Sequence, residues 1–494
     1  MSLHVSHDYI ISQFAVGEAL SERLSYFAKM TVSLPSVMGH SAGALSLADM
    51  PHQIARLRGI KRWGRLDGVR GAALSVSGFG RAVSLGDRVS IERYGEDLPG
   101  EVVAFSEDRV TVMPEGRSDG LVPGARVSLA ESPVLYPCAG WLGRVVDGLG
   151  RPVDDKGLLP QGATPMPLRR AAPSAFRRRL MGQRLETGLR VLDSFVPLCR
   201  GQRLGVFAAS GVGKSTLMGM LARFVGADVI VVGLIGERGR EVREFLDVVL
   251  GEEGLRRTVV VVATSDQPAL ARRRAAQATL AVAEWFRDQG KQVLCLLDSV
   301  TRLAHAQREI GLAAGEPATA RSYTPSVFAE LPALLERAGP GINGTGDITA
   351  IFTVLVDGDD HDEPVADAVR GILDGHLVLD RRIGERGRWP AIDVLRSVSR
   401  ALPRCHSDAE NRLLSEARRL LDAYERMAEM IRLGAYRSGS DPMVDLAIQK
   451  QPAFDAFLGQ KVNERSLAEE TFATLAQILD RPAPASEHPG EENP

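Results

Sequence analysis

Apolar and polar positions follow three different patterns along the chain. Between about residues 64 and 132, short apolar runs are separated by Gly, Pro and Asp. Short strands that recur at this spacing, with turn residues at the joins, predict a small β-barrel. The strands predicted there are residues 73–76, 88–93, 100–105, 110–113 and 125–129.

Beyond Pro133 the pattern changes to longer apolar runs that alternate with helical periodicity. Runs made almost wholly of Val, Ile and Leu are typical of strands that are buried on both faces of a parallel sheet. Their alternation with helices predicts an α/β domain built from β-α-β units. The predicted strands are residues 203–207, 229–235, 258–263, 293–297 and 348–356, and the predicted helices are residues 217–224, 267–288 and 326–337.

The two ends of the chain have patterns of their own. After Ser407 the strand patterns stop, and helical patterns over residues 410–433, 442–449 and 465–479 predict a separate helical region. Residues 53–63 are basic and place Ile54, Leu57, Ile60 and Trp63 at helical spacing. Such a helix either binds a partner or packs as a cap. Residues 481–494 are rich in Pro and Glu, and we expect them to be disordered.

Composition narrows the class of protein. A chain of 494 residues is expected to hold about three domains, at roughly 150 residues each. The net charge of −2 and the aromatic content of 5% give no general basic or base-stacking surface for nucleic acid. The four cysteines have no metal-ligand spacing, and Cys295 lies in an apolar run where it packs as a small hydrophobe.

These features also bear on location. No apolar stretch approaches the roughly 18 to 20 residues that span a bilayer, and the first residues carry no signal-peptide pattern. We therefore expect a cytoplasmic protein whose membrane association comes through partners. Met30, Met38 and Met50 leave open whether residues 1–48 all belong to the native chain.

Residues 207–216 read Phe-Ala-Ala-Ser-Gly-Val-Gly-Lys-Ser-Thr, between a predicted strand and a predicted helix. In that context a Gly-rich turn wraps phosphates with its backbone N–H groups, aided by the positive end of the helix. Lys214 is expected to reach the β- and γ-phosphates, and Ser215 to bind Mg²⁺. Ala208 replaces the usual first Gly, and a chance Gly-rich turn is the alternative. The predicted nucleotide-binding residues are Ala209, Ser210, Gly211, Val212, Gly213, Lys214, Ser215 and Thr216.

Two carboxylates follow predicted strands of the same sheet. Asp298 ends an apolar strand, where it is expected to lie beside the phosphate loop and to bind Mg²⁺. Glu237 follows the strand 229–235, in a position to polarise a water for attack on the γ-phosphorus, with Arg238 close enough to orient phosphate. The alternative for Glu237 and Arg238 is a charged helix start.

Several motifs in order resemble one family. They are Gly-Glu-Arg-Gly-Arg-Glu-Val, Asp-Ser-Val-Thr-Arg, Pro-Ser-Val-Phe-Ala-Glu-Leu-Pro, Asp-Gly-Asp-Asp-His-Asp-Glu-Pro and a late Gly-Ser-Asp-Pro. Over about residues 64 to 460 the chain resembles the flagellar export ATPases of type III secretion, relatives of the catalytic subunits of rotary ATP synthases. The resemblance implies an α/β fold with a central P-loop, RecA-like nucleotide-binding domain, an N-terminal small β-barrel and a C-terminal helical domain.

The expected domain division has five parts. Residues 1–60 form an N-terminal extension for partner binding or assembly, residues 61–132 the β-barrel and residues 133–405 the RecA-like ATPase domain. Residues 406–480 form the C-terminal helical domain, and residues 481–494 the tail.

The resemblance also assigns roles in the site. It implies that Glu237 is the catalytic carboxylate, that Lys214 contacts phosphate, and that Ser215 and Asp298 hold Mg²⁺. Arg238 and Arg302 match polar residues of the same pocket, and Arg400 matches an arginine finger that enters the neighbouring subunit's site. Two points depart from the family pattern. Residues 322–325 read Ser-Tyr-Thr-Pro, so we expect the local turn to differ from that of the family. The aromatic that stacks on adenine has no clear counterpart, with Phe352 as one candidate.

The function implied is that of a Mg²⁺-dependent ATPase of the flagellar export apparatus. It binds ATP, forms a homohexameric ring with catalytic sites at subunit interfaces, and promotes substrate unfolding, chaperone release and export. Its expected partners are a stator-like export regulator, a central stalk protein, export gate membrane proteins, and export substrates with their chaperones. A peripheral position at the inner membrane follows from those partners.

Three alternatives stay open at this point. The catalytic motifs do not separate a flagellar ATPase from that of a virulence injectisome. A non-catalytic nucleotide-binding subunit of a rotary ATPase is less favoured, because such subunits replace the carboxylate found at Glu237. A ring-shaped RNA translocase is expected to carry a basic, aromatic-rich domain ahead of the core, and the chain has none by composition.

Overall fold

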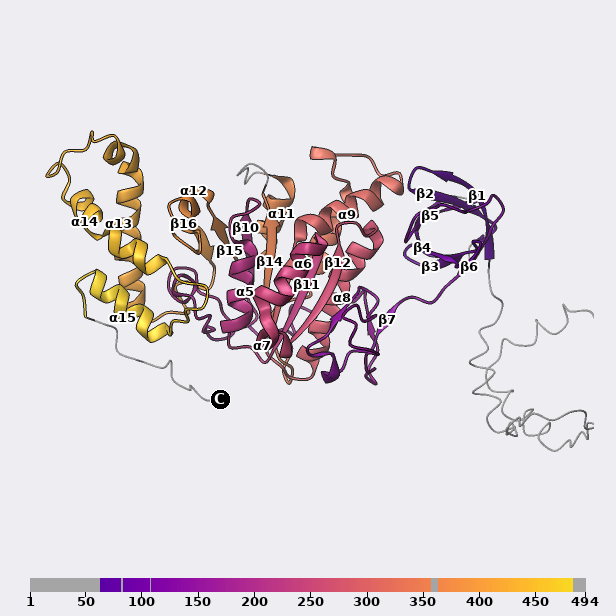
Figure 1. The fold of residues 1–494 in the computed structure, drawn as a ribbon, viewed down its shortest axis with the longest axis horizontal. Helices are drawn as coiled ribbons and strands as arrows, with labels where there is room; N and C mark the ends of the chain where they lie inside the picture. Colours follow the sequence, from indigo (N-terminus) through magenta and orange to yellow (C-terminus); the bar gives the residue numbers. More distant parts are fainter. Residues whose placement is uncertain (1–62, 81–82, 107, 357–362, 483–494) are drawn as a thin grey trace, which may run out of the picture. The chain divides into compact units, whose positions relative to one another are not determined.

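The computed structural model describes residues 63–80, 83–106, 108–356 and 363–482 (Figure 1). The extension expected at residues 1–60 and all but the first two residues of the tail at 481–494 lie outside the described residues. Within the described ranges, every helix is too short or too polar to cross a membrane.

Residues 63–129 form a closed antiparallel barrel with strand order β1-β2-β5-β4-β3-β6. The strands are β1 Trp63–Arg70, β2 Ala73–Ser77, β3 Arg88–Ile91, β4 Leu98–Phe105, β5 Arg109–Pro114 and β6 Arg126–Leu129. Inward positions such as Leu74, Val76 and Val89 are fully buried, whereas their neighbours along each strand are more exposed. This alternation confirms the predicted barrel.

The sequence pattern was wrong at the start of the barrel. Helical spacing assigns Trp63 to an amphipathic helix over residues 53–63, but Trp63 is the first residue of β1, which the pattern does not predict. Residues 53–62 of that expected helix lie outside the described residues. The sequence of this strand resembles a loop, because it contains Gly64, Arg65 and Asp67. Only one face of the strand, which includes Leu66, is buried. Pairing with both β2 and β6 holds the segment extended.

The centre of the chain is an eight-stranded sheet with the order β16-β15-β10-β14-β13-β11-β12-β8. All neighbours are parallel except β16, which runs antiparallel to β15 at one edge. The predicted strands correspond to β10 Arg203–Ala208, β11 Val229–Glu237, β12 Thr258–Thr264, β13 Val293–Asp298 and β14 Ile348–Leu355. The strands β8 Val145–Val146, β15 Gly375–Leu379 and β16 Ile392–Ser399 were not predicted.

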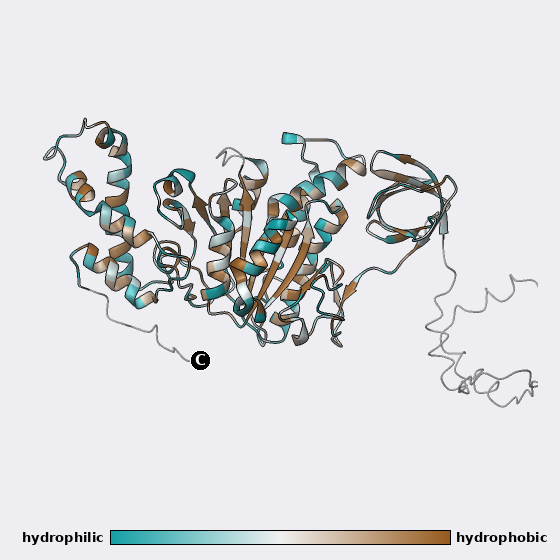
Figure 2. Cartoon of the chain, in the orientation of Figure 1, coloured by the Kyte–Doolittle hydropathy of each residue, from teal (hydrophilic) through white to brown (hydrophobic). Residues whose placement is uncertain are grey.

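Helices cover both faces of this sheet, and its strands are the most hydrophobic segments of the central region (Figure 2). Side chains that alternate along β10 belong to different apolar clusters: Val206 shares the first cluster with Leu217 of α5, and Phe207 shares the second with Leu280 of α8. Cys295 is fully buried in the second cluster, as predicted. The helices of this region are α4 Arg190–Asp193, α5 Lys214–Phe224, α6 Gly239–Glu244, a π-helical turn η2 Phe245–Leu250, α7 Gly251–Arg256, α8 Ala269–Asp288, α9 Val300–Ala313, α10 Pro325–Leu335, α11 Pro364–Ile372 and α12 Arg381–Glu385.

The C-terminal part is helical, as predicted, with α13 Asp408–Arg432, α14 Pro442–Leu458 and α15 Ala468–Ile478. Its helices belong to the same apolar cluster as Val206 and Leu217. In this cluster Phe195 and Phe457 meet edge to face, with ring centroids 6.4 Å apart. Short elements complete the chain: β7 Val134–Leu135, β9 Met166–Pro167, and the 3₁₀ turns η1 Ala139–Trp141 and η3 Ala320–Ser322.

The register of the parallel strands places three functional candidates at one edge. Ala208 at the end of β10 pairs with Leu355, Leu297 pairs with Phe352, and Leu234 pairs with Asp298. The loop that follows β10 and the carboxylates that end β11 and β13 therefore lie at the carboxyl edge of the sheet, where α/β proteins bind ligands.

Candidate active site

The predicted phosphate loop connects β10 to α5. Gly211 and Gly213 have φ of +81° and +82°, a left-handed conformation that glycine adopts without steric cost. Lys214 begins α5, whose first turn has neither a side-chain cap nor an acidic residue. The first N–H groups of this helix therefore keep their capacity to bind an anion.

Lys214 lies between the two predicted carboxylates. Its ammonium forms an ion pair with Asp298, and its Nζ is 3.7 Å from Oε1 of Glu237. The side chains of Lys214, Glu237 and Asp298 are only 11%, 15% and 5% exposed. Asp298 Oδ1 also accepts a hydrogen bond of 2.7 Å from Thr353 Oγ1. The structure thus brings together the three side chains that the sequence singled out.

Glu237 is held in an environment that disfavours its charge. Burial, followed by repulsion from Asp298, raises the pKa of Glu237 to about 7, although Lys214 and Arg302 act in the opposite direction. Its Oε1 is buried and accepts no hydrogen bond from the described residues. A carboxylate with a pKa near neutrality and a free acceptor atom is suited to take a proton.

Arg302 and Arg238 flank this carboxylate in different ways. Arg302 in α9 packs on the positive-φ Gly236, where an added Cβ would lie 2.9 Å from Arg302 Cβ. Its buried Nε has no hydrogen-bond partner among the described residues. Arg238 precedes α6, is 66% exposed and pairs with Glu241 at 3.3 Å. Arg302 therefore keeps a buried, unsatisfied donor next to Gly236, the residue before Glu237, whereas Arg238 is exposed.

The remaining predicted residues line the same edge. Ser215 and Thr216 occupy the first turn of α5 and are exposed, as are Ser210 and Gly211, whereas Ala209 and Val212 are buried beneath the loop. Backbone donors, a lysine, a hydroxyl and two carboxylates form a donor set that fits a polyphosphate with a divalent cation. The unsatisfied atoms of Glu237 and Arg302 support the same conclusion.

The candidate for adenine stacking was wrong. Phe352 lies in β14, is 0% exposed and belongs to the core cluster on the second face of the sheet. The aromatic that does meet the loop is Trp389, which is 43% exposed. A Cβ added to Gly213 would lie only 2.8 Å from the Trp389 ring. The signal that was missed is a tryptophan inside a polar, arginine-rich segment, where an apolar core residue is not expected.

A second contact with the loop also comes from this segment. Arg381, the first residue of α12, donates a hydrogen bond of 3.0 Å from Nη2 to the Ser210 carbonyl oxygen. Sequence spacing does not predict this contact, because 171 residues separate Arg381 from Ser210.

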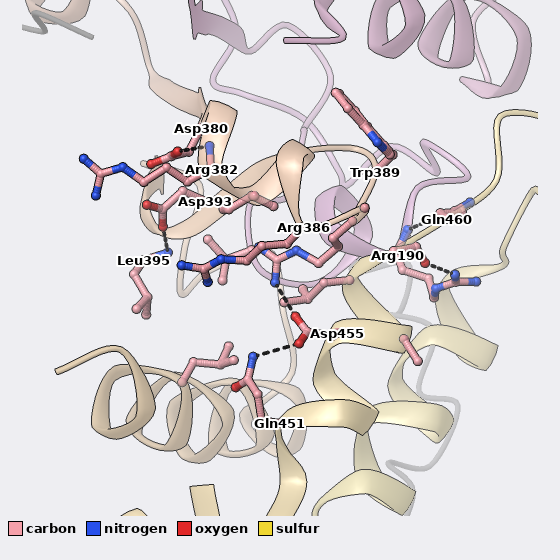
Figure 3. A pocket seen from close by; sticks show the side chains of 18 of the residues that line it. Arg190, Asp380, Arg382, Arg386, Trp389, Asp393, Leu395, Gln451, Asp455 and Gln460 are labelled. Carbon is pink, nitrogen blue, oxygen red and sulfur yellow. Dashed lines mark hydrogen bonds and ion pairs between the residues drawn. The ribbon is translucent and has the colours of Figure 1, made fainter. Parts of the chain in front are cut away.

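A groove of about 1240 Å³ is lined by residues between Asp380 and Leu395 and by residues of α13 and α14 (Figure 3). Arg388 and Gln451 both bond to Asp455 at 3.2 Å within it. None of residues 207–216 lines this groove, so it is distinct from the phosphate loop.

The turn at residues 322–325, where the sequence departs from the family pattern, has an irregular backbone. Arg321 and Ser322 have positive φ, and Pro325 is the first residue of α10. Tyr323 is buried and stacks on His305 with ring centroids 6.1 Å apart.

Arg400 does not reach the loop of its own chain. It follows β16, whose Ser399 pairs with Gly375 at the start of β15. Since β15 runs parallel to β10, this end of β16 lies at the edge of the sheet opposite the phosphate loop. Arg400 is exposed there, and its backbone N–H donates to the Asp374 carbonyl at 2.9 Å.

Comparison with known proteins agrees with the fold and the motifs. The profile of the ATP synthase alpha/beta family, nucleotide-binding domain, matches residues 188–399, and that of the T3SS EscN ATPase C-terminal domain matches residues 406–477. The flagellum-specific ATP synthase of Caulobacter vibrioides is 54% identical over 433 residues, which cover 86% of this chain and 98% of that relative. The type 3 secretion system ATPase of Xanthomonas euvesicatoria is 47% identical over 438 residues, which cover 87% and 97%.

Among solved structures, the assembled ATPase EscN from the type III secretion system of enteropathogenic E. coli aligns with a TM-score of 0.79 at 39% identity. That alignment covers 84% of this chain and 100% of EscN. The resemblance inferred from the motifs is therefore confirmed, and so is the combination of barrel, nucleotide-binding sheet and C-terminal helices. This chain belongs to the family of flagellum-specific ATP synthases and type III secretion system ATPases, and it is an ATP hydrolase.

Proposed function

We propose that the protein is the Mg²⁺-dependent ATPase of a flagellar type III export apparatus. The observation that carries this proposal is the cluster of Lys214, Glu237 and Asp298 beside the phosphate loop, in a chain of this family. The 54% identity to a flagellar relative, against 47% to an injectisome relative, favours the flagellar system.

In this proposal ATP binding rearranges the charges of the site. Lys214 leaves Asp298 for the β- and γ-phosphates, which give the ammonium a stronger anionic partner. Ser215 and Asp298 would then hold Mg²⁺, which neutralises phosphate charge when bound. Glu237 accepts the proton of the attacking water, while Arg302 and Arg238 orient phosphate oxygens. We also assign contact with the base to Trp389, because it is the exposed aromatic that packs on Gly213.

The site needs a second copy of the chain. Arg400 lies at the sheet edge opposite the phosphate loop, so as an arginine finger it would act on a neighbouring subunit. Such head-to-tail contacts close into a ring of identical sites, and we propose a homohexamer. Two solved relatives are the assembled ATPase EscN and EscN in complex with its central stalk EscO. A ring around a stalk protein is the arrangement that we propose here.

The wider setting follows from the family. We place the protein in the cytoplasm, held at the inner membrane by the export gate and by a stator-like regulator. There ATP hydrolysis would release substrates from chaperones and unfold them for export. The five-part domain division at residues 60, 132, 405 and 480 forms part of the same proposal.

The deciding experiment measures Mg²⁺-dependent ATP hydrolysis over a protein-concentration series, with Glu237→Gln as control. We expect specific activity to rise with concentration, because each site is completed at an interface. In Glu237→Gln we expect ATP binding to persist and turnover to fall by about 10²-fold or more, since only proton transfer is lost. ATP binding without any Glu237-dependent turnover would instead indicate a non-catalytic subunit.

The injectisome alternative needs a test in cells. Loss of the gene should abolish swimming in soft agar and the export of flagellin, and the wild-type gene should restore both. Unchanged motility together with loss of secreted effector proteins would assign the ATPase to an injectisome.

A further inference from the structure

The segment from Asp380 to Trp389, which we call the strap, contacts the phosphate loop at two points. Near its start, Arg381 donates to the Ser210 carbonyl at 3.0 Å, and at its end the Trp389 ring packs on Gly213. The two contacts lie on either side of Gly211, so the strap holds both ends of the part of the loop that wraps phosphate.

The Arg381 contact acts on one particular peptide group. In a planar trans peptide the carbonyl and the N–H of the next residue point in opposite directions. The peptide that carries the Ser210 carbonyl also carries the Gly211 N–H. A guanidinium that holds the carbonyl on the strap side therefore fixes the N–H on the other side.

This peptide has little else to hold it. Gly211 has a φ of +81°, and no atom lies within 4 Å of the position where its Cβ would be. Glycine adopts both signs of φ with similar ease, so rotation of this peptide meets no side-chain barrier. The hydrogen bond from Arg381 is thus the interaction that selects one orientation.

The strap is well placed to act as a fixed support. Asp380 donates its backbone N–H to Ala391 at 2.9 Å and caps the Arg382 N–H at 2.7 Å (Figure 3). At the other end, the Trp389 carbonyl accepts from the Gln460 N–H at 2.7 Å, and Arg388 pairs with Asp455 at 3.2 Å. Arg381 therefore projects from a segment that is tied at both ends.

We propose that Arg381 is a positioning residue of the phosphate loop, which turns the Ser210 carbonyl outward so that the Gly211 N–H faces the nucleotide phosphates. This inference rests on the proposed function, because it assumes that the loop binds ATP. It assigns Arg381 no contact with the reacting atoms. Its effect is to pre-organise one backbone donor before ATP arrives.

The test compares Arg381→Gln, Arg381→Lys and the control Arg382→Gln. Arg382 is the next residue of the same short helix and carries the same charge, and no hydrogen bond or ion pair joins its side chain to the loop. Equilibrium binding of Mg²⁺-ATP is measured with each variant in a Glu237→Gln background, where turnover does not interfere. Steady-state kinetics are measured with Glu237 intact, after circular dichroism has established that each variant is folded.

We expect Arg381→Gln to weaken Mg²⁺-ATP binding about three- to tenfold, which is the net range for losing one typical hydrogen bond. KM should rise by a similar factor and kcat should change less, because the donor acts on bound phosphate before and during the reaction alike. Arg381→Lys should recover part of the affinity, and Arg382→Gln should stay within about twofold of its parent.

Two results would overturn the proposal. One is binding by Arg381→Gln within about twofold of its parent. The other is an equal loss in Arg382→Gln, which would assign the effect to general positive charge near the site. A wild-type chain that binds but does not hydrolyse ATP would refute the proposed ATPase and would leave this binding comparison intact.

Discussion

At the scale of single residues, the candidate site is an arrangement of charges that ATP would disturb under the proposed function. Glu237 and Asp298 share one lysine, Lys214, which is also the residue that we propose to bind the phosphates. Without nucleotide, Lys214 stabilises both carboxylates, but burial and Asp298 still keep the pKa of Glu237 at about 7. The readiness of Glu237 to take a proton is therefore a property of the folded chain, set before substrate binds.

This arrangement predicts a pH dependence. Below pH 7 the raised pKa leaves Glu237 mostly protonated and unable to act as a base, so kcat/KM for ATP should rise as pH increases through about 7. The measurement is kcat/KM at saturating Mg²⁺ between pH 5.5 and about 9. Binding of ATP to Glu237→Gln over the same range isolates the titration of the nucleotide itself. An ascending limb fully accounted for by that binding curve would refute the assignment.

The sequence predicted the site residues that occupy local features of the backbone, such as tight turns and strand ends. Gly211 and Gly213 have positive φ, and Asp298 and Glu237 end strands, so spacing alone places them at one edge. Trp389 has no such local requirement. Its contact with Gly213 depends on how the strap packs, and an aromatic inside an apolar run, such as Phe352, belongs to the core instead.

At the scale of elements, the strands of the central sheet were predicted where both of their faces are buried. The central strands β10 to β14 are apolar at most positions, and this pattern indicates buried strands. The strand β16 at the sheet edge mixes buried and exposed positions, and β8 has only two residues, so neither produces a clear signal. Edge strands take their structure from their neighbours, and that information is not local.

The start of α13 offers a prediction about one element. Ser407 Oγ accepts from the Glu410 N–H at 3.2 Å, and Glu410 accepts from the Ser407 N–H at 2.7 Å, which is a complete capping box. Ser407→Ala should cost about 1 kcal/mol of local stability. Hydrogen exchange in the first turn of α13 should accelerate by about fivefold.

The control for this prediction is Ser415→Ala in the same helix. Ser415 is exposed, and its hydroxyl donates to the Asn411 carbonyl four residues earlier, which contributes little to the helix. Its exchange rates should stay close to those of the wild type. Equal acceleration in both variants would show that the cap does not hold this terminus.

At the scale of the whole molecule, the candidate catalytic residues lie at opposite edges of one sheet. Glu237 lies at the carboxyl edge of the parallel strands, and Arg400 lies at the opposite edge. One chain therefore carries a candidate base for its own nucleotide and a candidate finger for another copy. This geometry is the physical reason to expect activity to depend on assembly.

Mixed rings test this arrangement directly. Arg400→Ala alone should lose on the order of 10³-fold in turnover, because no finger neutralises charge in the transition state. Mixed with Glu237→Gln, it should regain activity wherever a Glu237→Gln subunit lends Arg400 to a site that retains Glu237. With random mixing in equal amounts, about a quarter of the interfaces carry that combination, so the mixture should approach a quarter of wild-type activity if sites act independently.

The matched control replaces Glu237→Gln by the double variant Glu237→Gln/Arg400→Ala, which assembles but has no finger to lend. We expect that mixture to stay as inactive as Arg400→Ala alone. Differently tagged subunits, recovered together by affinity capture, establish that mixed rings form. If mixed rings form and activity does not rise at any ratio, Arg400 does not act across the interface, and the proposed intersubunit site is wrong.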